Sequence, residues 1–472
     1  MMPLSSSEAE IIGMLPSGAG LAQVDGLPVV VPGALLGERV RMEWTPPAPG
    51  GRQGLAKHFE RLSHSPCLEA NPCPHAGACG GCPLGKIRED AAAKMKRRML
   101  MVDELVRAGL AAAPTVDAAQ ALVGDVLLQP SACRRGFRNK AVLYPTIRSG
   151  QARFGLYRAG THDVVPAEDC PQSPEWMGAA ARRAAKLIDD GALSIYDEAS
   201  HSGDVRALLM REGAPSDSGA RTERLASLIV REALSPEQKA AVLKAFEGLA
   251  IESLSFHVQP ERGNALLSFA PGATVLLAGK PAIDTAIDGL TFSVQPETFL
   301  QVNTPQTEVL YGLVMDALEL EPDDAVLDLY CGIGTMTLMA AKRAARGCAV
   351  GVELVEASVV SARANAQRNG IDNVSFFAGP VEKVLPTLPA MPGKTLKAIV
   401  DPAYKGLAEG VAQALAARSP ERIVYVACSP KHFARDAKRF EALGYALRRV
   451  TPVDLFPGAM HLETVGLLVK RD

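Results

Sequence analysis

The stretch that decides the fold reads Ala325-Val326-Leu327-Asp328-Leu329-Tyr330-Cys331-Gly332-Ile333-Gly334. It opens with an apolar run typical of a buried strand, and a helix to about Arg346 follows the two glycines. Further buried strands are predicted at 349–353, 374–377, 398–401 and 422–428. This alternation of strands and helices predicts an α/β fold, a doubly wound parallel sheet with helices on both faces.

Ligands of such sheets bind at the carboxyl ends of the strands, where this chain places Gly332, Gly334 and Glu353. Glycines let the backbone approach a ligand closely, and a carboxylate 19 residues beyond Gly334 is placed to accept hydrogen bonds from ribose hydroxyls. The third glycine of a dinucleotide fingerprint is missing, because Met336 and Thr337 occupy its place. The pattern therefore favours S-adenosylmethionine over NAD, since S-adenosylmethionine has no diphosphate to seat on a glycine-paved helix start. A tight turn without a ligand is the alternative.

The composition is that of a globular protein. The chain has 472 residues, which corresponds to about three domains, and 47% of them are apolar and 22% charged. No apolar run approaches the roughly 18 residues that cross a membrane, and no basic segment followed by an apolar core opens the chain. We therefore expect no membrane partner and a cytoplasmic location.

Two features of the N-terminal third point to a nucleic acid. Short strands predicted at 27–32 and 38–44, separated by glycine turns, indicate a small β-barrel of the OB type, a common oligonucleotide-binding platform. Between Lys86 and Gly160 there are 14 Lys and Arg but 6 Asp and Glu, a net charge of +8 in a chain whose net charge is −2. Such a segment is typical of a phosphate-binding surface. A solvated face of the helix predicted at 87–108 is the alternative.

Nine cysteines in a chain of this length indicate metal ligands or catalytic thiols, not a disulfide scaffold. Cys73, Cys79 and Cys82 lie on a loop rich in Gly, Pro and Asn, with Cys67 upstream and Cys170 downstream. A local zinc site through Cys67 and a cluster that includes Cys170 are both compatible with the spacing. Unligated thiols are a third alternative.

A further thiol, that of Cys428, is expected at the carboxyl ends of the strands, where such sheets bind their ligands. Asp401 follows one buried strand and Cys428 ends the next, so both are expected at neighbouring strand ends. A thiol in that position is a candidate nucleophile. Cys331 and Cys348 are expected to be small apolar fillers.

Together these motifs resemble the RNA uracil-5-methyltransferases, specifically the ribosomal-RNA branch with an N-terminal TRAM domain, over nearly the whole chain. Residues 31–40 resemble a TRAM strand pair, and residues 299–303 resemble the start of the methyltransferase domain. Residues 424–430 are similar to the family's nucleophile motif, and residues 454–463 to its C-terminal motif.

The resemblance implies a complete set of functional residues. Cys428 would be the nucleophile, and Glu463, brought back by a strand after Tyr445, the base. A 4Fe–4S cluster would be held by Cys73, Cys79, Cys82 and Cys170, without Cys67. S-adenosylmethionine would be contacted by Gln301, Tyr330, Gly332, Gly334, Glu353 and Asp401.

It also implies the domains and partners. We expect a class I methyltransferase domain from 87–112 with 286–472, a TRAM barrel at 1–62, and a strand-rich iron–sulfur domain from 63–86 with 113–285. The partner would be RNA, 23S ribosomal RNA more than transfer RNA, and the protein a monomer.

The chain departs from this family at two points, and two other functions compete. Ala403-Tyr404 replaces the family's Pro-Arg after Pro402, and residues 377–380 lack its asparagine near the adenine. The residues from Asp401 to Tyr404 also resemble a motif of methyltransferases that modify an exocyclic amine. That class needs no cysteine, so it leaves Cys428 and Glu463 unexplained. A non-catalytic RNA-binding protein of the same fold is the other alternative.

Overall fold

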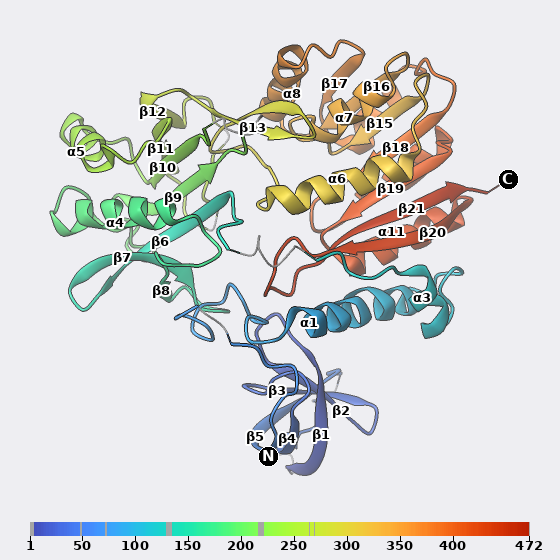
Figure 1. Cartoon of the computed structure of the whole chain (residues 1–472), viewed down its shortest axis with the longest axis horizontal. Helices are drawn as coiled ribbons and strands as arrows, with labels where there is room; N and C mark the ends of the chain where they lie inside the picture. The colour runs from blue at the N-terminus through green and yellow to red at the C-terminus, as the bar shows by residue number, and fades with distance from the viewer. Residues whose placement is uncertain are drawn as a thin grey trace.

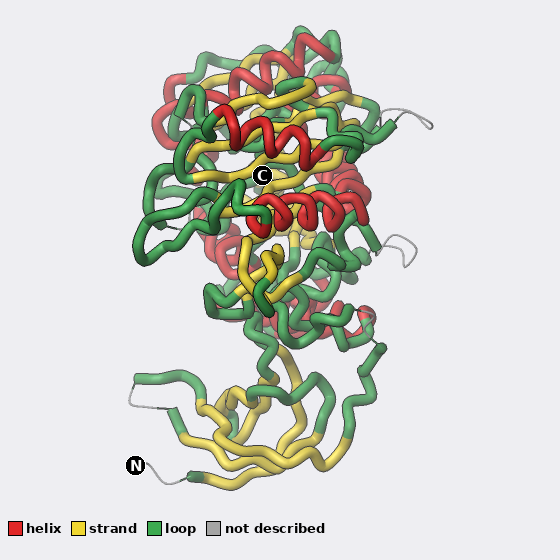
Figure 2. The backbone as a smooth tube through the Cα atoms, turned by 90° about the vertical axis from the view of Figure 1, so that its left-hand side faces the viewer, coloured by secondary structure: helices red, strands yellow, loops and turns green. Residues whose placement is uncertain are grey.

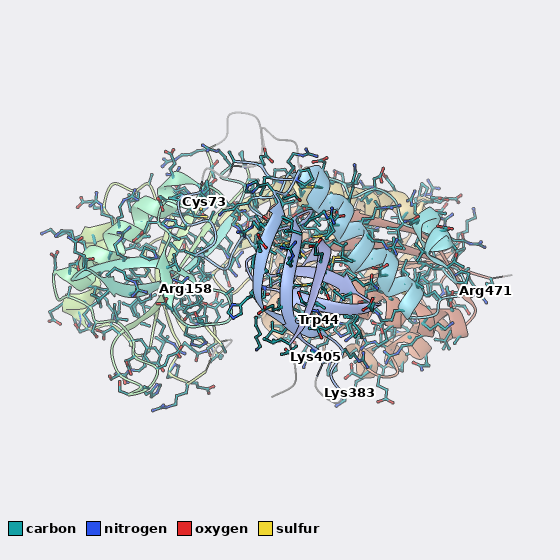
Figure 3. The ribbon with its side chains drawn as sticks, turned by 90° about the horizontal axis from the view of Figure 1, so that it is seen from below. Trp44, Cys73, Arg158, Lys383, Lys405 and Arg471 are labelled. Carbon is teal, nitrogen blue, oxygen red and sulfur yellow. The ribbon has the colours of Figure 1, made fainter. Side chains whose placement is uncertain are left out.

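The structure is a computed structural model that describes residues 4–47, 50–70, 73–128, 135–215, 221–263, 265–268 and 270–471. It has three lobes: an N-terminal barrel, a central domain and a larger C-terminal domain (Figure 1). From the side the barrel stands below the rest of the molecule (Figure 2). From below it lies over the junction of the two larger domains (Figure 3).

The barrel is built from short strands whose side chains alternate between its interior and the solvent. In β4 (Arg39–Thr45) Val40, Met42 and Trp44 are buried, and the charged residues between them are exposed. The prediction of a barrel is confirmed: it is closed, in the order β1-β2-β3-β5-β4. The other strands are Ser5–Met14 (β1), Gly20–Val24 (β2), Leu27–Val31 (β3) and Gly54–Ser63 (β5).

The basic helix predicted at 87–108 is present and contains a π-helical turn. It comprises α1 (Glu89–Lys96), η1 (Arg97–Val102) and α2 (Asp103–Arg107). Lys96 is fully buried, and its Nζ lies 2.7 Å from Oδ2 of the buried Asp454. The helix is therefore anchored to the C-terminal domain and does not simply present a solvated face.

The central domain is a seven-stranded sheet of order β12-β11-β10-β9-β6-β7-β8. Two helices, α4 (Glu175–Asp189) and α5 (Pro236–Phe246), share its apolar core. The strands are Lys140–Arg148 (β6), Gln151–Tyr157 (β7), Val164–Pro166 (β8), Val205–Glu212 (β9), Arg224–Val230 (β10), Ser253–Val258 (β11) and Thr274–Gly279 (β12).

The domain boundary predicted at residue 113 needs correction. Helix α3 (Val116–Leu122) packs on the C-terminal domain, and Val123 and Leu127 form bridges with Val450 and Val453 of that domain. Ala113, Ala119 and Val123 are buried in a core of the C-terminal domain, which explains why this segment follows that domain. The hairpin of β13 (Ile283–Ile287) and β14 (Leu290–Val294) lies at the junction, in a core shared by both domains.

The C-terminal domain confirms the predicted doubly wound sheet. Its order is β17-β16-β15-β18-β19-β21-β20; the first five strands are parallel, and β21 is antiparallel to both neighbours. The strands are Ala325–Leu329 (β15), Cys348–Glu353 (β16), Val374–Ala378 (β17), Leu396–Val400 (β18), Arg422–Ala427 (β19), Tyr445–Val453 (β20) and Glu463–Lys470 (β21). The helical segments are Thr304–Leu318 (α6), Thr335–Arg343 (α7), Glu356–Arg368 (α8), Val381–Val384 (α9), Leu385–Thr387 (η3), Val411–Ala417 (α10) and Pro430–Ala442 (α11).

Helices on the two faces of this sheet enclose two separate apolar cores. Within the described ranges, no helix combines the length and apolar character needed to cross a bilayer.

Candidate functional site

The loop between β15 and α7 carries the two glycines of the deciding motif. Gly332 has a φ of 54° and Gly334 a φ of 83°, values in the left-handed region that favours glycine. A Cβ on Gly332 would meet no atom within 4 Å, whereas one on Gly334 would lie 3.0 Å from the Phe376 ring. Gly332 therefore leaves room for a ligand, while Gly334 permits close packing against β17.

Glu353 is held against this loop at the carboxyl end of β16. The backbone N–H of Gly332 donates to its Oε2 at 3.1 Å, and that of Val355 donates to its Oε1 at 2.9 Å. Tyr330 turns the chain out of β15 with a φ of 67°, and burial raises the pKa of its phenol to about 12. The structure thus brings together the loop and the acid that the sequence separates by 19 residues.

Asp401, Cys428 and Glu463 come from the neighbouring strands β18, β19 and β21. Asp401 directly follows β18, Cys428 directly follows β19, and Glu463 begins β21. The antiparallel ladder of β19 and β21 ends at the pair of Ala427 and Thr464, and Cys428 and Glu463 are the residues directly beyond that pair. The charge of Glu463 acts on the Cys428 thiol, so the two groups lie near each other.

Burial controls the protonation of these three groups. It raises the pKa of Asp401 to about 7, and together with the charge of Asp401 it raises that of Glu463 to about 8. Burial, then the charges of Glu463 and Asp401, raises the pKa of the Cys428 thiol to about 11. At neutral pH the thiol and the Glu463 carboxyl keep their protons, and a cation placed beside them would favour ionisation.

Two further groups face the same place and were missed from sequence. Asp328 is buried; its Oδ2 accepts a hydrogen bond from the Thr337 hydroxyl at 2.5 Å, and its Oδ1 has no partner among the described residues. Burial raises its pKa to about 7. Tyr311 on α6 is buried, and its pKa is raised by burial and by the charges of Asp401, Asp328 and Glu463. An acid inside an apolar strand is a readable signal for Asp328, but nothing in the helix marks Tyr311.

Gln301 lies in the segment that precedes α6 and is buried. Asn139 of the central domain donates a hydrogen bond from its Nδ2 to the backbone oxygen of Gln301 at 2.9 Å. Two residues on, Asn303 caps α6 and donates from its Nδ2 to the oxygen of Leu455 at 2.9 Å. The segment is thereby tied both to the central domain and to the loop that leads to Glu463.

The four predicted cluster cysteines line one cavity of about 490 Å³ in the central domain. Cys67 does not line it and packs instead in the apolar contact between the barrel and α1. Burial raises the pKa of Cys82 to about 11 and also raises those of Cys73 and Cys79. Across the described part of the chain, no three His, Cys, Asp or Glu side chains are arranged to hold a single metal ion.

The cysteine loop also touches the loop of residues 454–462, which leads into β21. The N–H of Leu84 donates to the oxygen of Gly458 at 2.8 Å, and a Cβ on Gly458 would lie 3.5 Å from the Cβ of Cys82. From the other side, Gln172 donates from its Nε2 to the oxygen of Pro457 at 2.9 Å. The cysteine cavity and Glu463 are therefore joined through one short loop.

Comparison with known proteins agrees with this architecture. A family model described as a methyltransferase domain matches residues 320–402. The chain is 32% identical to an uncharacterized RNA methyltransferase of Halalkalibacterium halodurans, over 98% of this chain and 97% of the relative. The chain belongs to the RNA methyltransferase family.

Other relatives extend this assignment. An uncharacterized RNA methyltransferase of Gloeobacter violaceus is 36% identical over 98% of this RNA methyltransferase and 95% of its own length. Among solved structures, the Pyrococcus abyssi tRNA (uracil-54, C5)-methyltransferase in complex with S-adenosyl-L-homocysteine aligns with a TM-score of 0.73. It is 23% identical, and the alignment covers 98% of this chain and 99% of that one. The fold is thus shared over the full length.

Proposed function

We propose that this RNA methyltransferase transfers a methyl group from S-adenosylmethionine to carbon-5 of a uridine, with Cys428 as the nucleophile and Glu463 as the base. The observation that carries the proposal is the proximity of Cys428, Glu463 and Asp401 at the ends of neighbouring strands, where both carboxyls act on the thiol. A thiol and a carboxyl that lie close together can act on neighbouring carbons of one ring.

The residues at the carboxyl edge of the sheet suit S-adenosylmethionine. Glu353, fixed by two backbone N–H groups, would accept hydrogen bonds from the ribose hydroxyls, and Gly332 leaves room beside the loop. Bound S-adenosylmethionine supplies an electrophilic methyl group on a positively charged sulfonium. The remaining proposed contacts are Gln301, Tyr330, Gly334 and Asp401.

The chemistry of the protein's own groups follows from their positions. The Cys428 thiol gives up its proton to solvent, its sulfur bonds to carbon-6, and the electron pair of the carbon-5–carbon-6 double bond makes carbon-5 nucleophilic. Carbon-5 then bonds to the methyl group as the bond between that methyl and the sulfonium sulfur breaks. Glu463, which would lose its own proton when the sulfonium cation binds beside it, takes the carbon-5 proton as a carboxylate. The freed pair re-forms the double bond, and the carbon–sulfur bond breaks to release the thiolate. The uridine must be out of its stack for Cys428 to reach the ring.

The four thiols of the cysteine cavity are proposed to hold a 4Fe–4S cluster. An all-thiol donor set suits iron–sulfur chemistry, and all four thiols face one cavity. A cluster of several iron atoms separates its ligands more widely than one ion does, which fits thiols that do not converge on a single point. The cluster would cross-link residues 73–82 to Cys170.

The RNA is proposed to be bound by the N-terminal TRAM-like barrel and the basic segment. The cysteine loop and barrel favour 23S ribosomal RNA, as expected from the sequence. The shared fold of a transfer RNA methyltransferase makes transfer RNA the second candidate.

One assay separates these proposals. The protein is incubated with S-adenosylmethionine labelled in its methyl group and with either 23S ribosomal RNA or transfer RNA, and the modified nucleosides are identified. Labelled 5-methyluridine is the expected product. A nucleoside methylated on an amine would replace the proposal with the exocyclic-amine reaction, and no incorporation into either RNA would contradict it.

A further inference from the structure

A second cavity, of about 470 Å³, opens on the central domain beside the cysteine cavity. The two cavities share Gly80, Tyr144 and Tyr157 in their walls. None of the described residues that line the second cavity belongs to the carboxyl edge with Cys428 and Glu463. Its size lies within the roughly 300–1,000 Å³ typical of small-ligand sites.

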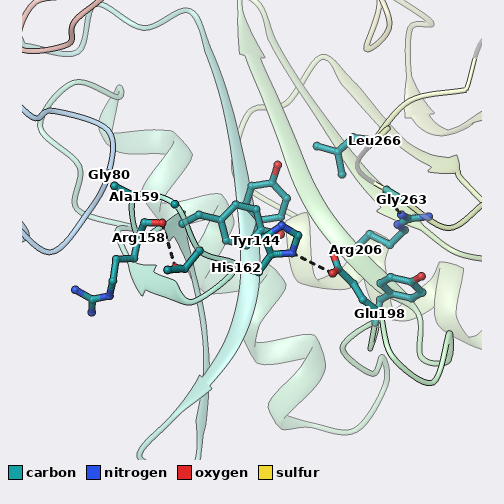
Figure 4. Close-up of a pocket in the computed structure, with 13 residues that line it drawn as sticks. Gly80, Tyr144, Arg158, Ala159, His162, Glu198, Arg206, Gly263 and Leu266 are labelled. Carbon is teal, nitrogen blue, oxygen red and sulfur yellow. Dashed lines mark hydrogen bonds and ion pairs between the residues drawn. The ribbon is translucent and has the colours of Figure 1, made fainter. Parts of the chain in front are cut away.

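Three stacked rings form one wall of this cavity. The ring centroids of Tyr144 and Tyr157 are 4.1 Å apart with planes at 27°, and those of Tyr157 and His162 are 5.1 Å apart at 20°. Figure 4 shows Tyr144 and His162 at the centre of the cavity, with Leu266 across from them. A further flat ring can stack on aromatic rings that line a cavity in this way.

The opposite side carries a fixed positive charge. Arg206 is buried; its Nη1 donates to the oxygen of Gln259 at 2.8 Å and its Nη2 to that of Gly263 at 2.9 Å. The guanidinium carbon lies 4.6 Å from the centroid of the Tyr196 ring. Because its donors bind backbone oxygens, Arg206 contributes a rigid cationic surface, not a mobile one.

The remaining polar groups are neutral or paired. Burial raises the pKa of Tyr157 to about 12 and also raises that of Tyr144, so both phenols stay uncharged donors. Nδ1 of His162 lies 3.0 Å from Oε2 of Glu198. Arg158 also lines the cavity, and its Nε lies 3.3 Å from Oδ2 of Asp163, which pairs with Arg148 as well.

We propose that this cavity binds one unstacked base of a single-stranded stretch of the RNA substrate, outside the reaction site. The inference rests on the proposed function in that RNA is taken as the substrate. Flat aromatic rings and a fixed guanidinium in one cavity are the combination that captures bases with little sequence preference. The bound base anchors the strand and takes no part in methyl transfer.

The first test compares steady-state constants. Tyr157→Leu and His162→Ala are each expected to raise the KM for RNA on the order of 10-fold, with kcat and the KM for S-adenosylmethionine unchanged. Tyr157→Phe keeps the ring and should restore most of the affinity. Leu243→Ala, at an exposed position on α5, is the control in the same domain. Because His162 is exposed, its variant decides the matter if Tyr157→Leu fails to fold.

The second test is photo-crosslinking of RNA that carries 4-thiouridine at successive positions. We expect one position to crosslink to the segment 154–158, which contains Tyr157, in the protein without S-adenosylmethionine. Unchanged KM values together with no crosslink in this segment would overturn the base site. A crosslink here in a protein that forms no 5-methyluridine would support the base site and contradict the proposed reaction, so the two failures are distinguishable.

Discussion

The carboxyl edge of the C-terminal sheet and the cysteine cavity of the central domain assemble their reactive groups in different ways. At the edge, Cys428 and Glu463 are 35 residues apart in sequence but come close together because the β19–β21 ladder brings the ends of the two strands side by side. In the cavity, Cys79 lies on a loop held by turn hydrogen bonds such as Cys79 N–H to the oxygen of His75 at 3.0 Å. A strand-built site exists before its ligand binds, whereas a loop-built site gains much of its rigidity from the ligand.

The largest effect is expected from removing the thiol at the strand-built site. Cys428→Ala should lower methyl transfer by at least ~10³-fold, because no other group can add to carbon-6. Binding of S-adenosylhomocysteine, measured by calorimetry, should stay nearly unchanged. Cys348→Ala is the matched control, since that thiol lies at the opposite end of the strands. Near wild-type methylation by Cys428→Ala would exclude the covalent mechanism.

The second effect concerns the carboxyl near the thiol. Glu463→Gln keeps the shape but cannot accept the carbon-5 proton, so turnover should fall about 10²- to 10³-fold. Addition of Cys428 and methyl transfer should still occur, leaving methylated RNA attached to the protein in denaturing electrophoresis. The Cys428→Ala, Glu463→Gln double variant should show no adduct. Normal turnover by Glu463→Gln would remove this residue from the mechanism.

A third, smaller effect tests the loop-built site. Cys170→Ser should abolish the iron and sulfide that anaerobically purified protein is expected to contain, while Cys67→Ser should retain both. Because the cysteine loop contacts residues 454–462, the backbone amides of residues 454–462 should exchange hydrogen faster in Cys170→Ser. Methylation should fall roughly 10- to 100-fold. Metal loss in Cys67→Ser but not in Cys170→Ser, or zinc in place of iron, would favour the local site through Cys67.

The smallest effect is a dependence of cofactor affinity on pH. The pKa values of Asp401, about 7, and Glu463, about 8, mean that the free protein carries protons that a sulfonium cation would expel. Affinity for S-adenosylmethionine should therefore rise from pH 6 to pH 8 and level off above pH 8, because binding releases protons only while the free protein still carries them. S-adenosylhomocysteine lacks the charge and should show a much flatter profile. Identical slopes for both ligands would contradict this account.

Much of the fold was readable because local patterns agree with the tertiary structure. The apolar run at 325–330 is buried on both faces of a parallel sheet, so its identity as a strand does not depend on distant residues. The error at residue 113 has the opposite origin: the short helix Val116–Leu122 carries no mark of which sheet it covers. Only its packing beside Val450 decides the domain to which it belongs.

The functional residues divide in the same way. The glycine loop, the acid 19 residues later and the candidate nucleophile could be predicted from the sequence. Each lies at the end of a strand that is recognised from its own short run of residues. Spacing alone left two cysteine sets open; in the structure Cys67 packs half-buried against the barrel, whereas Cys170 lines the same cavity as Cys73, Cys79 and Cys82.

Tertiary structure alone decided the groups that meet through space. Tyr311 reaches the carboxyls from a helix, and the rings of Tyr144, Tyr157 and His162 stack across a hairpin and a loop. Such neighbours arise from packing between elements, which no sequence period encodes. Burial likewise set the charge of the site: an aspartate or glutamate in sequence is read as ionised, but removal from water, together with the charge of Asp401, raises the pKa of Glu463 to about 8.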